Sequence, residues 1–166
     1  LNLGLKTKII KKALKNFSGV QRRLTKVFKK NKIEFYDDYA HHPTEIKSVL
    51  EGFRKVASKR KIIVVFQPHR YSRIKSLKSE FVSCFKSSNQ VILCPVYAAG
   101  ETIDQDYKDK KFAQLISKFS KTQVILIKDE NDLNKYFKKN LIKDEIVIGM
   151  GAGSISNWMY NLKNNL

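Results

Sequence analysis

The arginines of this sequence indicate the chemistry it could carry. Only six of the 33 basic residues are arginine, and four of those six fall in two short segments, as Arg22, Arg23, Arg70 and Arg73. Arginine binds planar carboxylate and phosphate groups through two parallel hydrogen bonds. Arg70 and Arg73 also stand near the start of an expected helix, where the helix dipole disfavours cations. They could be solvated charges, but their position favours an anionic ligand.

Polar and aromatic residues follow four apolar runs that are expected to form strands. These segments are Asp37–Pro43, Gln67–Arg73, Pro95–Glu101 and Gly149–Gly153, and they contain all three histidines of the chain. In open α/β sheets, ligands bind beyond the carboxyl ends of the strands. We therefore expect these segments to meet at one edge of a sheet and to form a site there.

Each segment also has a purely structural interpretation. Asp38 could cap a turn instead of binding the hydroxyl pair of a ribose, and His41 and His42 could form the turn into a helix. Tyr97 and Glu101 could be ordinary loop residues. A metal site is not expected, because neighbouring histidines point apart and no His-x₃-His spacing or cysteine partner is present.

Strands and helices that alternate along the chain must position these segments. We expect strands at 24–29, 33–38, 62–66, 91–94, 124–127 and 146–148, the first two as a possible hairpin, and helices at 3–15, from Pro43, at 74–86, 108–119, 130–139 and from Ser154. This order predicts an α/β fold with a Rossmann-like, doubly wound, mostly parallel sheet of about six strands and helices on both faces. The helix from Pro43 should bury one face at the helical spacing Ile46, Val49, Leu50, Phe53 and Val56.

Composition excludes several classes of protein. The chain has 166 residues, of which 42% are hydrophobic, so one domain with a proper core is expected. No apolar run approaches the ~18 residues of a membrane span. Cys84 and Cys94 have no CxxC spacing, which favours two buried thiols in a reducing cytoplasm. The net charge of +18 allows a basic nucleic-acid-binding module, but its lysines are scattered, so we expect no nucleic-acid partner.

Several motifs together resemble the Mur ligases, a family of ATP-dependent cell-wall ligases. The resembling segments are FSGVQRR at 17–23, DDYAHHPTE at 37–45, QPHRYSR at 67–73, YAAGE at 97–101 and GAG at 151–153. The resemblance implies a three-domain enzyme with a UDP-sugar domain, a central P-loop domain and a C-terminal Rossmann-like domain. The sequence contains no G-x-x-x-x-G-K-[ST] motif. We therefore expect residues 1–17 to be a tail helix and linker from a central ATPase domain, residues 18–166 to be the C-terminal domain, and this chain to be inactive alone.

The resemblance further implies a reaction and its ligands. It implies ATP-dependent joining of L-alanine to UDP-N-acetylmuramate through an acyl phosphate, in the cytoplasm, with Mg²⁺ held mainly by the central domain and the phosphates. It implies that Arg23 reaches the phosphates of ATP and that Asp38 binds its ribose. The residues that match the alanine-binding surroundings are Tyr39, His41, His69, Arg70 and Arg73.

The candidates for a catalytic role are His41 and Arg70. An arginine fork would fix the alanine carboxylate and leave the amine free to attack. A neutral histidine nearby could accept the ammonium proton, although the sequence leaves open which histidine does so.

Two other functions are considered as alternatives. One is a related recycling ligase, which would attach a tripeptide instead of alanine. A dinucleotide-binding domain is disfavoured, because the glycines of 149–153 lack the full G-x-G-x-x-G pattern and better suit a tight strand-to-helix turn.

Overall fold

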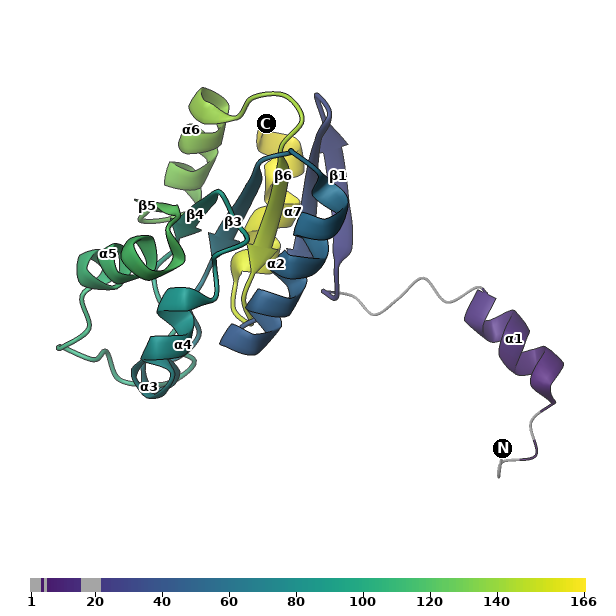
Figure 1. The fold of residues 1–166 in the computed structure, drawn as a ribbon, viewed down its shortest axis with the longest axis horizontal. Helices are drawn as coiled ribbons and strands as arrows, with labels where there is room; N and C mark the ends of the chain where they lie inside the picture. The colour runs from purple at the N-terminus through teal and green to yellow at the C-terminus, as the bar shows by residue number, and fades with distance from the viewer. Residues whose placement is uncertain (1–3, 5, 16–21) are drawn as a thin grey trace.

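A computed structural model describes Gly4, residues 6–15 and residues 22–166. Its sheet has the strand order β1-β2-β6-β3-β4-β5, with β1 antiparallel to β2 and every other pair parallel (Figure 1). This confirms the predicted fold class. The elements are α1 (Thr7–Lys15), β1 (Thr25–Lys30), β2 (Ile33–Asp38), α2 (Pro43–Ala57), β3 (Ile62–Phe66), α3 (Tyr71–Ser76), α4 (Lys78–Ser83), β4 (Gln90–Leu93), α5 (Asp109–Ser120), β5 (Gln123–Leu126), α6 (Glu130–Asn140), β6 (Ile146–Met150) and α7 (Ile155–Asn165).

Helices cover both faces of the sheet, and α1 lies apart from this body (Figure 1). All five residues of β3 are buried, as are all five of β6. Alternate residues of β3 enter two separate cores, because successive side chains of a strand point to opposite faces. Val64 packs with residues of α2, α4 and α5, whereas Val65 packs with residues of α6 and α7. The result is a three-layer α/β domain whose central strands are shielded on both sides.

The first two strands form the expected hairpin. Asn31 and Lys32, at its turn, have φ values of 51° and 66°. Two consecutive left-handed residues match the twist of a two-residue hairpin connection. Across the pair, the rings of Phe28 and Phe35 stack with centroids 4.1 Å apart. The hairpin thereby brings Asp37 and Asp38, at the end of β2, beside the end of β6.

Two details of the predicted elements were wrong. The single helix expected at 74–86 is two short helices, α3 and α4, because Leu77 leaves helical geometry with φ −116° and ψ 29°. Val56 is 79% exposed, and Ala57 is buried instead. Ala57 follows Ile46 by about three helical turns and shares its face, whereas Val56 is rotated roughly 80° from Ile46. The strand predicted at 124–127 is present as β5, one residue earlier, at the edge of the sheet, and its end residues Gln123 and Leu126 are exposed.

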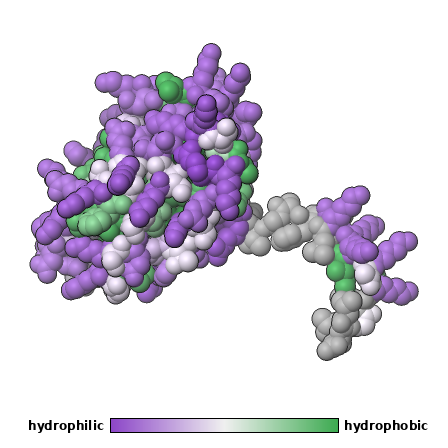
Figure 2. All heavy atoms as spheres, in the orientation of Figure 1, coloured by the Kyte–Doolittle hydropathy of each residue, from purple (hydrophilic) through white to green (hydrophobic). Residues whose placement is uncertain are grey.

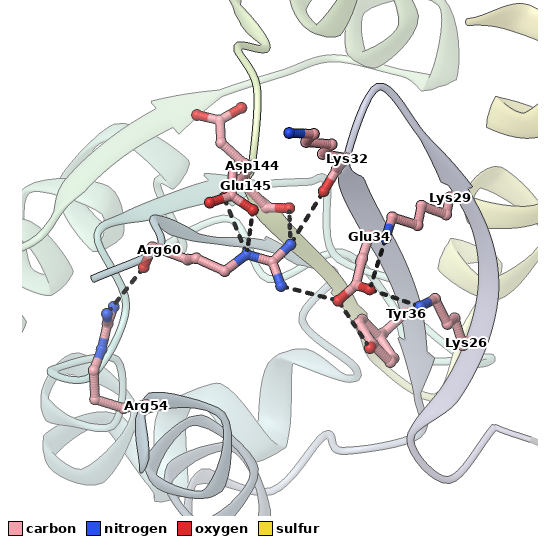
Figure 3. Close-up of polar contacts among 9 residues, drawn as sticks. All are labelled: Lys26, Lys29, Lys32, Glu34, Tyr36, Arg54, Arg60, Asp144 and Glu145. Atoms are coloured by element: carbon pink, nitrogen blue, oxygen red, sulfur yellow. Dashed lines mark hydrogen bonds and ion pairs between the residues drawn. The ribbon is translucent and has the colours of Figure 1, made fainter. Parts of the chain in front are cut away.

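Arg60 is the centre of a cluster of polar contacts (Figure 3). The cluster lies at the starts of β2, β3 and β6, at the edge of the sheet opposite to the strand ends that carry the motifs. Nη1 of Arg60 lies 3.0 Å from Oε2 of Glu34, and its Nη2 donates to the carbonyls of Lys32 and Glu145, each at 3.2 Å. Nε of Arg60 lies 3.0 Å from Oδ1 of Asp144. Arg60 therefore ties the hairpin to the segments that enter β3 and β6.

The two cysteines are free and buried, as the sequence predicts. Burial raises the pKa of both thiols, so they are unreactive at neutral pH. Hydrophilic residues cover most of the face drawn in Figure 2. Among the residues that the structure describes, no helix is both long enough and apolar enough to cross a membrane.

Candidate functional site

Four aromatic rings from three strand ends form a row at the carboxyl edge of the sheet. The ring centroids of Tyr39 and His41 lie 5.1 Å apart, and those of His41 and His69 lie 5.8 Å apart. His69 stacks on Tyr97 at 5.6 Å with an interplanar angle of 20°. The segments after β2, β3 and β4 therefore meet, as expected for a site at the strand ends.

The glycine turn after β6 packs directly under this row. A Cβ atom on Gly153 would lie 2.5 Å from Cγ of Tyr97 and 2.5 Å from Oε1 of Gln67. Gly151 has φ +149°, and a Cβ there would lie 2.7 Å from the carbonyl oxygen of Gln67. Buried Gln67 also accepts from the backbone N–H of Ile155 at 3.0 Å and so joins β3 to the start of α7. These glycines form the expected tight strand-to-helix turn.

Arg70 has a strained backbone directly beside the row of rings. Its φ of 70° and ψ of 133° are unusual for a residue with a side chain. The backbone N–H of Arg70 donates to the carbonyl of Tyr97 at 2.9 Å, which helps to hold this conformation. Its side chain is exposed at the carboxyl edge of the sheet. Strained residues of this kind concentrate at binding sites.

The contacts of His69 define the role of each ring nitrogen. Nη1 of Arg73 lies 3.0 Å from Nδ1 of His69. Arginine can only donate, so Nδ1 accepts and the hydrogen of the neutral ring is on Nε2. Burial lowers the pKa of His69, and the charges of Arg73, His41 and Arg70 lower it further. His69 is therefore neutral at neutral pH and offers an N–H donor.

His41 has the opposite arrangement. Its Nδ1 lies 2.9 Å from the carbonyl oxygen of Tyr39, and a carbonyl can only accept, so Nδ1 carries the hydrogen. The carboxylate of Glu45 lies 3.5 Å from the same nitrogen. In the neutral ring, Nε2 of His41 therefore keeps a free lone pair. His42 instead caps α2, where its Nδ1 accepts from the backbone N–H of Thr44 at 3.3 Å.

Asp38 holds the backbone at two positions through hydrogen bonds, and Arg23 lies near it. The carboxylate oxygens of Asp38, which is 3% exposed, accept from the backbone N–H groups of Leu24 and Ala40, each at 2.8 Å. The turn-capping interpretation of Asp38 is thus confirmed. Arg23 has a 55% exposed side chain 3.7 Å from Glu45. Arg23 and Asp38 line one open hollow of about 400 Å³, together with Leu24, Thr44, Glu45, Ser48 and Val49.

Sequence reasoning missed roles for three residues at this edge. Arg22 contacts the glycine turn, Gln67 joins β3 to α7, and Tyr97 completes the row of rings. Tyr97 was considered, but a loop residue and a site residue look alike without the fold. For the residues that the structure describes, no three His, Cys, Asp or Glu side chains gather as metal ligands.

The fold is a Rossmann-like α/β domain, and histidine and arginine side chains gather at the carboxyl ends of its strands. The chain belongs to the Mur ligase family, because the model of the Mur ligase, glutamate ligase domain matches residues 22–153.

Two curated relatives and two solved structures give the detail. The chain is 49% identical to UDP-N-acetylmuramate–L-alanine ligase of Pelagibacter ubique over 98% of its own length, and 38% identical to that of Bartonella tribocorum over 99%. It spans about a third of these relatives, 35% and 34%. It also matches the crystal structure of UDP-N-acetylmuramate–alanine ligase from Thermotoga maritima, with a TM-score of 0.76, 25% identity and coverage of 98% of this chain and 34% of that one. A murein peptide ligase from Psychrobacter arcticus shares the fold, with a TM-score of 0.73, 19% identity and coverage of 99% and 34%.

Proposed function

We propose that the chain is the C-terminal, amino-acid-binding domain of an ATP-dependent ligase that joins L-alanine to UDP-N-acetylmuramate in peptidoglycan precursor synthesis. The observation that carries the proposal is the 49% identity to an alanine-adding ligase over 98% of the chain, a span that must include most of the strand-end segments. Residues 1–17 would be a tail helix and linker from a central ATPase domain, and residues 18–166 the C-terminal domain. The UDP-sugar and P-loop domains would lie elsewhere in the same polypeptide. The free buried thiols fit a cytoplasmic location.

The proposed reaction has two steps. The lactyl carboxylate of the sugar attacks the γ-phosphate of ATP, which releases ADP and leaves an acyl phosphate. The amine of L-alanine then attacks the acyl carbon, an amide bond forms, and inorganic phosphate leaves. This domain would contribute by holding the alanine so that its amine faces the acyl carbon.

The arginines would hold the alanine carboxylate. Arg70 presents an exposed guanidinium, and its backbone is held by the carbonyl of Tyr97. Arg73 lies beside His69, whose Nε2–H is a further donor for the same carboxylate. A fork with two parallel hydrogen bonds fixes orientation as well as position. Tyr39 would form one wall of this site, since its ring packs against His41.

His41 would accept the proton that the ammonium group must lose. Its Nε2 has a free lone pair because Nδ1 is committed to the carbonyl of Tyr39. The carboxylate of Glu45, near Nδ1, would stabilise the imidazolium that forms. His69 is less suited to this step, because Arg73 occupies the only nitrogen that could accept.

Arg23 and Asp38 would contact ATP. Both line the hollow beside the start of α2, and the exposed guanidinium of Arg23 suits a phosphate. The carboxylate of Asp38 keeps lone pairs beyond the two that accept backbone hydrogen bonds, so it could still accept from a ribose hydroxyl. The described residues do not fit a metal site of their own, so Mg²⁺ would be held by the phosphates and the central domain.

Phosphate release by the complete ligase tests the proposal. With ATP, Mg²⁺ and UDP-N-acetylmuramate present, L-alanine should stimulate release strongly, whereas a murein tripeptide should not. The 166-residue chain alone should stay at background. Preference for the tripeptide would assign the chain to a recycling ligase, and turnover by the isolated chain would contradict the proposed division of labour between domains.

A further inference from the structure

The side chain of Arg22 lies where two segments of the carboxyl edge meet. Its Nη2 donates to the carbonyl of Gly151 at 2.9 Å and to that of Gly153 at 3.3 Å. Its Nε lies 4.0 Å from the buried carboxylate of Asp37. The guanidinium carbon lies 4.7 Å from the centroid of the Tyr39 ring. One side chain therefore contacts the end of β2, the residue after it and the glycine turn after β6.

The backbone around Arg22 is tied to the same strand end. Arg22 and Leu24 are both left-handed, with φ values of 59° and 51°. Such conformations persist in residues with side chains only where the surroundings enforce them. The carbonyl of Arg22 accepts from the N–H of Tyr39 at 2.6 Å, and the N–H of Leu24 donates to Asp38 at 2.8 Å. These bonds fix the backbone position of Arg23, which lies between Arg22 and Leu24 in the sequence.

The glycine turn that Arg22 binds also supports the other half of the site. Gly153 packs against the ring of Tyr97 so closely that a Cβ atom would not fit. Tyr97 in turn stacks on His69, and its carbonyl holds the N–H of Arg70. A shift of this turn would therefore move the residues proposed to bind the amino acid.

We propose that Arg22 is a positioning residue that couples the nucleotide side of the site to its amino-acid side. The inference rests on the proposed function. The Arg22 backbone sets the place of Arg23. The guanidinium anchors that backbone to the glycine turn beneath Tyr97 and His69, so its loss should release both sides. The planar guanidinium is essential, because it bonds two carbonyls while its face covers Tyr39 and its Nε faces Asp37. A lysine keeps the charge but not this geometry.

The kinetics of Arg22→Lys and Arg22→Ala in the complete ligase test the inference. A small displacement of a positioned group can lower the reaction rate by about a hundredfold. We expect kcat to fall roughly tenfold to a hundredfold in both variants, with KM raised for both ATP and L-alanine. The Arg22 side chain is 30% exposed, so solutes can reach the space that Arg22→Ala vacates. Guanidinium ion at non-denaturing concentration should restore part of the activity of this variant, and methylammonium should not.

Arg54→Lys is the matched control. Arg54 also donates to backbone carbonyls, those of Ser87 and Arg60, but next to the start of β3 rather than at the carboxyl edge. Its substitution should lower the melting temperature and leave both KM values unchanged. If Arg22→Lys behaves like Arg54→Lys, or raises KM for one substrate alone, Arg22 does not couple the two sides, and the same holds if folded Arg22→Ala resists rescue. Should Arg22→Ala fail to fold, Arg22→Lys still decides. A wild-type ligase without alanine-dependent turnover would instead contradict the proposed function.

Discussion

Arg73 and His69 face each other at the carboxyl edge of the sheet, with Nη1 of the arginine 3.0 Å from Nδ1 of the imidazole. This contact places a fixed positive charge beside a ring that burial already keeps neutral. It also leaves His69 with one tautomer, in which Nε2 carries the hydrogen. The two histidines therefore have different roles: His69 is a hydrogen-bond donor, whereas the free nitrogen of His41 can accept a proton.

Replacement of Arg73 should raise the pKa of His69. Its pKa is lowered by burial first and by the charge of Arg73 second, so Arg73→Gln should return it part of the way toward its ordinary value of about 6.5. Titration of the ring by NMR would measure this. Arg54→Gln, which removes an arginine that contacts Ser87 and Asn89 instead, should leave the His69 pKa unchanged. A His69 pKa that fell in Arg73→Gln would show that the hydrogen-bond assignment is wrong.

The contacts of Glu34 should make the stability of the fold depend on pH in the acid range. Hydrogen bonds from Lys26 and Arg60 lower the Glu34 pKa from 4.5 to about 2, against the effect of burial. Because the folded pKa lies below the unfolded one, the carboxylate stabilises the fold fully above about pH 4.5 and loses this effect as pH falls toward about 2. Glu34→Gln should lower the free energy of unfolding by about 2 kcal/mol at neutral pH.

Urea denaturation across this pH range measures the effect. The difference between wild type and Glu34→Gln should shrink steadily below about pH 4.5. Glu51→Gln is the control, because Glu51 makes an exposed ion pair with Lys47. Its replacement should change stability by less than about 1 kcal/mol. A pH-independent Glu34→Gln difference would mean that the loss comes from packing and not from charge.

Gly153→Ala should disturb the site and the fold together. The added Cβ would lie 2.5 Å from both the Tyr97 ring and the Gln67 side chain. Overpacking of this kind costs about 1–3 kcal/mol, and the Tyr97 ring should lose its stacking on His69, visible as changed NMR shifts of both rings. Gly52→Ala is the control, since a Cβ there would meet nothing within 4 Å. In the interior of α2 it should stabilise the chain by about 0.5–1 kcal/mol.

His41→Asn tests the proton acceptor in the complete ligase. The asparagine amide can still donate to the carbonyl of Tyr39, while the lone pair of Nε2 is lost. Removal of a general base typically costs about 10²–10⁴-fold. We expect kcat to fall in this range and to recover partly as pH rises, because the free alanine amine then loses its proton to water. His69→Asn should lack that recovery. Near wild-type turnover by His41→Asn would exclude His41 as the base.

The sequence predicted the fold well because its signal is periodic and local. Apolar runs such as 62–66 mark buried strands, and Pro43 with Glu45 marks the start of a helix. The break at Leu77 was missed because the apolar spacing continues through it. Val56 was misplaced because its spacing from Phe53 fits a helix, whereas burial depends on where α2 passes the sheet.

The site was predictable only in part. The strand-end rule identified which segments would meet, and the structure brings His41, His69 and Tyr97 into one row. The contacts that distinguish the two histidines come from Arg73 and from a backbone carbonyl, which sequence spacing does not reveal. The contacts of Arg22 were missed for the same reason, since its partners Gly151 and Gly153 are about 130 residues away.

Arg70→Lys in the complete ligase is the most direct test of where alanine binds. Lysine keeps the charge but loses the planar fork, so one of two parallel hydrogen bonds to the carboxylate disappears. Loss of one charge-assisted bond costs on the order of 1.5–3 kcal/mol, which corresponds to roughly a tenfold to hundredfold fall in kcat/KM for alanine. ATP should be little affected, since Arg23 and Asp38, its proposed contacts, line a different part of the surface. Arg70→Ala should be worse, because it also removes the charge. If Arg70→Lys raised KM for ATP and left that for alanine unchanged, Arg70 would be a phosphate contact, and the row of His41, His69 and Tyr97 would not be the alanine site.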